Sequence, residues 1–302
     1  IFAMWDTVEE ADAFSEDDRL RVTRMLLCFL HSLVAKTSDY DSLEDNETIV
    51  WNHTTFPLMG LYWGGRYFRR YYGLKETDVY LAKAAGAFRG QEKSWKPQCD
   101  ADSYLVLTMG HTIEYALAEG RMGFFDSGNI RAYADYLMGI CDNAGWAPGF
   151  GDSGLIRDTR IPLAGVPYAF WYTADPRYLG YLNAISDGAW PNPYHQDVEP
   201  EPPESLTGVR SYPLDRQVYE YTASRPYYAE PSGPPNVPRS QAFDKVSYRS
   251  GLNPDDQFFV LDGYARGKHL HYDANAILKL TQQSEDWLVD ADYLVRNTTE
   301  HN

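Results

Sequence analysis

The feature that most constrains the fold of this 302-residue chain is a series of amphipathic segments with helical periodicity before residue 186. Segments of this kind include a helix predicted to start near Thr54 or Thr55, with Pro57 in its first turn, and to stop after Tyr72 at Gly73. Others are predicted over residues 77–88, over 102–118 with an end at Gly120, over 129–140, and in shorter pieces between 163 and 182. Repeated helices with short connections, but no exact sequence repeat, predict a helical array, either a toroid or a solenoid. In the first segment, the apolar residues that follow the 3-and-4 spacing of one helix face are Val22, Leu26, Phe29, Leu30, Leu33 and Val34.

The pattern changes after residue 187. Most of the chain's 18 prolines lie in residues 188–240, which excludes long helices there, and the Tyr and Trp content argues against simple disorder. Short apolar runs at 258–261, 276–280 and 287–289, separated by turn residues, then predict strands. We therefore expect an α+β multidomain chain: a helical (α/α) toroid over 1–187, an ordered Pro-rich linker with a few short strands over 188–240, and the start of an antiparallel β-sandwich over 241–302.

The β-rich part looks incomplete. Three or four strands make a poor independent sandwich. We expect either that the chain is an N-terminal part of something longer, or that it associates with another segment or a second copy.

The charge and composition narrow the function class. A net charge of −16 argues against a general nucleic-acid binder. No apolar run reaches about 18 residues, so no membrane span is expected. The 24 tyrosines and 8 tryptophans are compatible with a carbohydrate cleft and equally with an aromatic core.

Two histidines, His269 and His271, follow a strand-like run and a turn. Residues two apart on an extended chain share one face, so both imidazoles can serve one site as acid, base or metal ligand. With Asp290 and His301 they include a donor set suited to zinc, although the spacing is irregular. The alternative is a set of solvated or core residues.

Asn52 and His53 precede the predicted second helix. Amide and imidazole donors at a helix N-terminus suit an anion, whereas the alternative is that Asn52 or Thr54 only caps the helix. In the fourth segment, Tyr104 and His111 are seven residues apart and share a helix face. A tyrosine acts as a base only where its pKa is lowered, and any one of 24 tyrosines is more often structural.

Taken together, these residues resemble a known family. Gly267-x-His269-Leu-His271-x-Asp273-x-Asn275, then Trp287-Leu-Val-Asp290 and Thr299-Glu-His301-Asn302, is similar to the sandwich start of heparinase II/III-type polysaccharide lyases. Some alginate lyases and dermatan sulfate epimerase are related to this family. Asn52-His53 opening a helix, with Tyr104 about fifty residues on, resembles the helical half of the family's site.

The resemblance implies roles for these residues. Asn52 would neutralise a uronate carboxylate, while His53 and His269 would flank the sugar. Tyr104 would act as acid, base or both. His111 or Tyr115 could replace it, because the sequence around Tyr104 departs from the family pattern. Some members of the family bind a structural zinc. Its ligands would correspond here to His271, Asp290 and His301.

The implied activity is β-elimination from a uronate-containing polysaccharide by a secreted or periplasmic enzyme. His111, Arg66 and Arg157 are candidate substrate-binding residues, and Arg160 is a further candidate contact, although surface ion pairs would explain the arginines equally well. Three alternatives stay open: a uronyl C5-epimerase, a non-catalytic carbohydrate-binding protein, and a glycoside hydrolase. The hydrolase would need paired carboxylates, for which the candidate pairs are Asp100 with Asp102 and Asp152 with Asp158.

Overall fold

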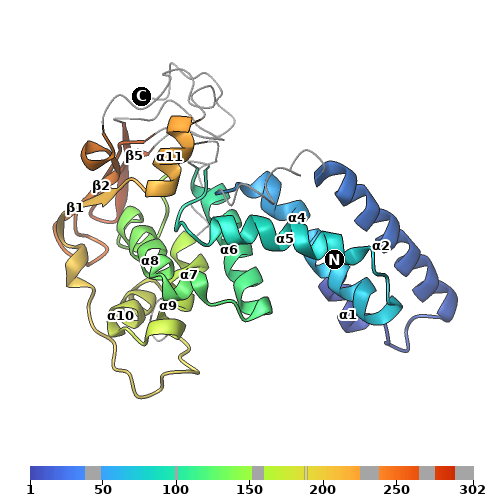
Figure 1. Ribbon diagram of the computed structural model, residues 1–302. Helices are drawn as coiled ribbons and strands as arrows, with labels where there is room; N and C mark the ends of the chain where they lie inside the picture. The colour runs from blue at the N-terminus through green and yellow to red at the C-terminus, as the bar shows by residue number, and fades with distance from the viewer. Residues whose placement is uncertain are drawn as a thin grey trace.

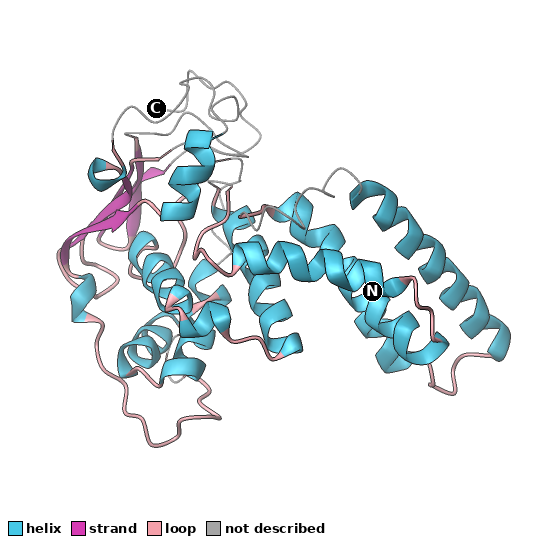
Figure 2. Ribbon diagram, viewed as in Figure 1, coloured by secondary structure: helices cyan, strands magenta, loops and turns pink. Residues whose placement is uncertain are grey.

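The computed structural model describes residues 1–37, 49–98, 101–151, 160–186, 188, 190–224, 238–264 and 276–289. It is an α+β arrangement in which a mostly helical N-terminal region is followed by a five-stranded antiparallel sheet (Figures 1 and 2). Helices α1 and α2 lie at the end of the molecule farthest from the sheet (Figure 1). Within these ranges, no helix is both long and apolar enough to cross a membrane.

The helices predicted from periodicity are confirmed to within a few residues at most ends. Gly73 ends α4 as expected, in the left-handed region with φ of 66° that glycine tolerates. The helices of the described chain are α1 (Phe2–Val8), α2 (Glu16–Thr37), α4 (Asn52–Tyr72), α5 (Thr77–Gln91), α6 (Asp102–Glu119), α7 (Gly123–Asp126), α8 (Asn129–Ile140), α9 (Val166–Thr173), α10 (Pro176–Ile185) and α11 (Arg216–Ser224).

The start of α4 differs from the prediction. The helix begins at Asn52, and Trp51, with extended backbone, is the N-cap residue. The backbone N–H groups of Thr54 and Thr55 both donate to the Trp51 carbonyl, so neither Asn52 nor Thr54 is the N-cap residue. Pro57, expected in the first turn, consequently lies inside the helix, where its ring supplies no N–H to the carbonyl one turn earlier.

The sheet has the strand order β1-β2-β3-β4-β5, with antiparallel neighbours throughout. Its strands are β1 (Gly208–Pro213), β2 (Phe243–Arg249), β3 (Phe258–Asp262), β4 (Ile277–Gln282) and β5 (Glu285–Val289). The last three are the predicted apolar runs. Strand β1 and helix α11 both lie within the Pro-rich segment 188–240, so this segment contributes a strand to the sheet.

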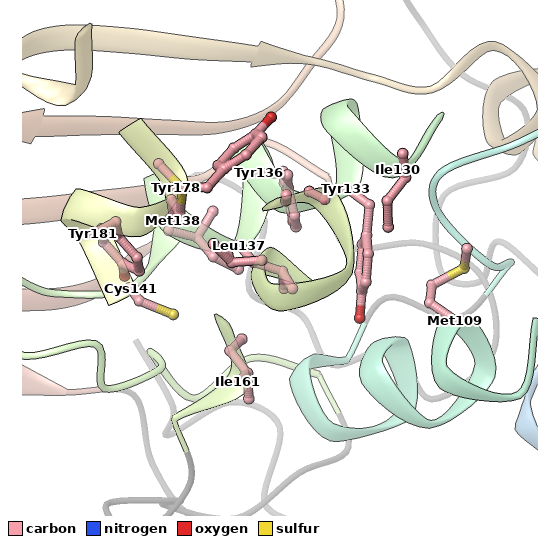
Figure 3. Close-up of a cluster of buried hydrophobic side chains, with 14 of the residues drawn as sticks. Met109, Ile130, Tyr133, Tyr136, Leu137, Met138, Cys141, Ile161, Tyr178 and Tyr181 are labelled. Atoms are coloured by element: carbon pink, nitrogen blue, oxygen red, sulfur yellow. The ribbon is translucent and has the colours of Figure 1, made fainter. Parts of the chain in front are cut away.

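One face of the sheet packs on the helices. Phe258, Val260 and Leu278 are buried in the same cluster as residues of α6, α8, α9 and α10, including Tyr133 and Leu137 (Figure 3). A second cluster joins α1, α2, α4 and α5. There α4 approaches α1 and α2 so closely that a Cβ on Gly64 would lie 2.7 Å from Leu30 and 2.8 Å from Phe2.

Buried charges also join the sheet to the helices. The Arg249 guanidinium on β2 donates to the carbonyls of Met138, Gly139 and Cys141 at the end of α8. Asp244 and Lys245, fully buried on the same strand, pair with each other at 3.1 Å. Lys96, in the α5–α6 connection, forms an ion pair with Asp244. The sheet is therefore held to the helical region by polar contacts as well as by the apolar core.

Candidate functional site

Helices α4 and α6 run in the same direction. Thr55 contacts His111 near the start of α4, and Tyr62 contacts Glu119 farther along both helices. Residue numbers therefore increase in the same direction along both helices, as they do in parallel neighbours. The N-terminal ends of α4 and α6 therefore lie at the same end of the pair, and these ends carry Asn52 and Tyr104.

The first turn of α4 presents two different side chains. Asn52 is only 3% exposed, whereas His53 is exposed. The imidazole of His53 stacks on the Trp51 indole, with ring centroids 4.4 Å apart and an interplanar angle of 11°. The His53 ring thus packs on the residue that precedes the helix, while the side chain remains exposed to solvent.

His111 of α6 contacts α4 at Thr55, one turn along that helix from Asn52. Its Nδ1 is 2.9 Å from Thr55 Oγ1, and its ring meets Phe56 edge-on at a centroid distance of 4.6 Å. Burial lowers the pKa of His111 to about 4. At neutral pH the imidazole is consequently neutral and serves as a hydrogen-bond donor or acceptor, and does not supply a positive charge.

Tyr104 lies two turns before His111 on the same face of α6 and is partly buried. Asn52, His53 and Tyr104 thus lie at the N-terminal ends of two parallel helices, and His111, seven residues after Tyr104, contacts the start of α4. This grouping is what the helix periodicity alone could not establish, because it depends on the parallel packing of α4 against α6.

Two cavities flank these helices. One of about 860 Å³ is lined by Asn52, His53 and Phe56, and one of about 760 Å³ by His111 and other residues of α6. Trp63 and Glu114 line both, and Trp63 Nε1 donates to Glu114 Oε1 at 2.7 Å. Sequence reasoning missed Phe56, Trp63 and Glu114. The signal for the first two was present, since Phe56 is three residues after His53 and Trp63 is seven residues after Phe56.

The residues just before α4 pack on α11 and on the segment that follows β3. Ile49, three residues before Asn52, packs with Leu214, Val218, Tyr221 and Tyr264. The backbone of Val50 is fixed by the Gln91 side chain at 2.9 Å and by the Gln98 N–H at 3.1 Å. Tyr264 is two residues beyond the end of β3, so the exit of that strand adjoins the start of α4.

Three strand ends share one edge of the sheet. The Asp262 N–H at the end of β3 donates to the Ala276 carbonyl just before β4. Val289 at the end of β5 is paired with Lys279, near the start of β4. The predicted residues His269, His271, Asp290, His301 and Arg157 lie outside the described residues. Within the described part of the chain, no group of three or more His, Cys, Asp or Glu side chains is placed to hold a metal ion.

Other predicted residues lie elsewhere. Arg66 is 14 residues after Asn52, about 21 Å along the helix, and its guanidinium contacts Tyr62, the Ala118 carbonyl at 3.2 Å and Glu119 at 3.6 Å. The structure does not bring it to Asn52. Arg160 lies over the Trp146 ring, 4.8 Å from its centroid.

Tyr115 is not a suitable replacement for Tyr104. It is 4% exposed and stacks on Phe88 at 4.5 Å within the core. Burial raises its pKa, which disfavours the phenolate. Of the carboxylates considered for hydrolysis, Asp102 is fully buried at the start of α6, and its proposed partner Asp100 and the Asp152–Asp158 pair lie outside the described residues.

Comparisons with known proteins give a likeness of fold. No protein-family model matches the sequence, and no curated protein matches it. A crystal structure of heparinase III matches 96% of this chain with a TM-score of 0.61 and 12% sequence identity. A second heparinase III structure, with methylated lysines, also matches 96% with a TM-score of 0.54 and 13% identity. The chain spans 40% and 38% of those two chains.

Proposed function

We propose that this chain carries part or all of the active site of a polysaccharide lyase that cleaves a uronate-containing glycan by β-elimination. The observation that carries the proposal is the parallel packing of α4 on α6, in which His111 contacts Thr55 near Asn52 and His53. Ile49, just before α4, also packs on Tyr264, just after β3. The heparinase III-like fold supports the same class of reaction.

The proposed reaction uses these residue types directly. The C5–H bond and the C4–O bond of the uronate break, a C4=C5 double bond forms, and the leaving oxygen receives a proton. The C5 proton is acidic enough only when the carboxylate is neutralised, which is the role proposed for the Asn52 amide with His53. Tyr104 is proposed to remove the proton and protonate the leaving oxygen, with His269 as the alternative base. Neutral His111 would donate a hydrogen bond to the sugar without adding charge.

The finer architecture belongs to the same proposal: a toroid over 1–187, a linker over 188–240 and a sandwich from 241. A second sheet would cover the outer face of the first, where partly exposed Tyr248, Phe259 and Leu280 are register neighbours. A structural zinc held by His271, Asp290 and His301 is proposed on the chemistry of the donors and on the shared sheet edge of their flanking strands. Metal analysis of the purified protein tests it. A secreted or periplasmic location is likewise proposed.

Ultraviolet absorbance during incubation with a panel of uronate polysaccharides tests the reaction, because only elimination forms an unsaturated uronate. The panel would contain alginate, glucuronan, hyaluronan, chondroitin, dermatan, heparan and ulvan. Tyr104→Phe, Asn52→Ala and His269→Ala should each lower kcat by at least about a hundredfold. Tyr194→Phe, a loop tyrosine that is 69% exposed, is the matched control and should keep full activity.

Equal activity in Tyr104→Phe and the wild-type protein would disprove the site assignment. A flat absorbance trace on every polysaccharide would remove the lyase proposal. Proton exchange at C5 in heavy water would then identify an epimerase, and binding without exchange would identify a carbohydrate-binding protein.

A further inference from the structure

One face of α4 changes its chemistry along the helix. Phe56, Trp63 and Arg70 recur at a spacing of seven and therefore share a face, which begins one turn after Asn52 and His53. The 17 residues from His53 to Arg70 span about 26 Å. The helix passes from a polar start through this aromatic face to a cationic end.

A hollow follows this face. The cavity of about 860 Å³ at Asn52 and a cavity of about 270 Å³ at Arg66 and Arg70 have three lining residues in common, Phe2, Ala3 and Trp63. The two cavities therefore adjoin at α1 and Trp63, and together they are called the groove along α4. Trp63 lies at the junction, held by its hydrogen bond to Glu114.

The far end of the groove is positive although the chain is strongly acidic overall. Arg66, Arg69 and Arg70 line the small cavity, against the single carboxylate of Asp6. Arg69 is paired with Asp78 at 3.0 Å, and Arg66 lies 3.6 Å from Glu119. Among the described residues Arg70 forms no ion pair, and its guanidinium lies 5.3 Å from the Tyr71 ring centroid. A local positive field of this kind attracts anions despite the net charge of −16.

A helix-stabilising role accounts for part of this arrangement. Arg69 and Arg70 lie in the last turn of α4, where positive charge interacts favourably with the helix dipole. That role requires neither a cavity nor Trp63 beside the guanidinium groups. Guanidinium groups at the end of an aromatic-lined groove suit the carboxylate or sulfate groups of a glycan chain.

We propose that the groove along α4 ends in a second anion-binding subsite at Arg66 and Arg70, which holds a carboxylate or sulfate of an acidic glycan whose reacting uronate lies at Asn52. Trp63 supplies the surface on which an intervening sugar ring packs. The inference rests on the proposed function for the class of ligand, but its test is a binding measurement that does not depend on turnover.

The test is calorimetric titration with tetrasaccharides and decasaccharides of hyaluronan and of heparan sulfate. Titrations are carried out with the wild-type protein and in a Tyr104→Phe background, which limits consumption of the ligand. Arg70→Gln should weaken decasaccharide binding about three- to tenfold and reduce its salt dependence, because one exposed charge-assisted contact is lost. Tetrasaccharide binding should be unchanged, since the shorter ligand does not reach from Asn52 to Arg70.

Arg131→Gln on α8 is the matched control, because it removes one half-exposed arginine charge away from the groove. Arg66→Gln is a second test variant should Arg70→Gln fold poorly. A loss confined to heparan sulfate identifies a sulfate subsite, and a loss with both glycans a carboxylate subsite. Equal decasaccharide affinity in Arg70→Gln and wild type, equal weakening by Arg131→Gln, or no binding of any decasaccharide would overturn the inference. A flat absorbance trace with intact, Arg70-dependent binding would remove the lyase proposal alone.

Discussion

Burial decides what the His111 imidazole can do. Its pKa of about 4 lies below the ordinary value of 6.5, because the buried charged form loses hydration. Between those two values the unfolded chain binds more protons than the folded one. The free energy of unfolding should therefore fall as the pH drops from about 6.5 to 4, by at most about 1.4 kcal/mol per pH unit from this residue.

Urea unfolding at pH 7, 5.5 and 4.5 measures this contribution. His111→Gln keeps a hydrogen-bonding group near Thr55 but cannot titrate, so its loss of stability on acidification should be smaller than that of the wild-type protein. His31→Gln on α2 removes an exposed imidazole, so it is the control and should behave as wild type does. Parallel pH profiles for His111→Gln and wild type would contradict the buried, neutral imidazole.

Single residues show where the sequence was informative about the site. Asn52, His53, Tyr104 and His111 were identifiable because each lies at a helix start or at helical spacing from one. The contact between His111 and Thr55 was not, because it joins residues 56 positions apart. Arg66 illustrates the same gap, since its charge suggested substrate binding while its partners Tyr62 and Glu119 depend on the packing of α4 on α6.

At the scale of elements, Arg249 couples β2 to α8. Its guanidinium accepts no hydrogen bonds and donates to Met138 at 2.8 Å and to Asn143 Oδ1 at 2.9 Å, with further contacts to Gly139 and Cys141. Arg249→Met would leave these buried acceptors without their donor. We expect a loss of about 3–5 kcal/mol in the free energy of unfolding, measured by urea denaturation.

The matched comparisons separate geometry from charge. Arg249→Lys keeps the charge but not the planar fork of donors, so it should recover only part of the loss. Arg216→Gln removes an exposed arginine that pairs with Glu220 at 2.7 Å on α11, and should cost less than about 1 kcal/mol. An Arg249→Met variant as stable as Arg216→Gln would show that Arg249 does not help to hold β2 to α8.

Helix and strand ends were predictable from the sequence where neighbouring residues alone determine them. The ends of α4 and α6 at Gly73 and Gly120 were readable because a left-handed glycine terminates a helix by itself. Short strands were expected in the Pro-rich linker but β1 was not located, because its six residues are stabilised by pairing with β2, which begins thirty residues after β1 ends. The N-terminus of α4 was misplaced because the extended backbone of Trp51, and no capping side chain, sets it.

For the whole molecule, the sequence indicated the order of helices and strands but not which parts meet. Ile49 and Tyr264 share one small cluster although they are far apart in the chain. The ion pair of Lys96 with Asp244 likewise joins the α5–α6 connection to β2. Contacts of this kind depend on the complete arrangement of helices and sheet, and they are what place the end of β3 beside the start of α4.

These contacts make a prediction about cooperativity. Burial opposes ionisation of Asp244, but Lys245 and Lys96 outweigh it and hold the pKa of the carboxyl below its usual value, so the group is a buried carboxylate at neutral pH. Lys96→Met removes one of its two ammonium partners and should lower the free energy of unfolding by about 3–5 kcal/mol. Hydrogen exchange followed by mass spectrometry should show faster exchange in both β2 and α8, because Tyr136 of α8 also donates to Asp244, at 2.8 Å. Amides of α1, which packs on α4 at the opposite end, serve as the internal control and should keep their rate of local exchange. If β2 lost its protection while α8 kept it, the sheet would open independently, and the buried charges would not bind the two regions into one cooperative unit.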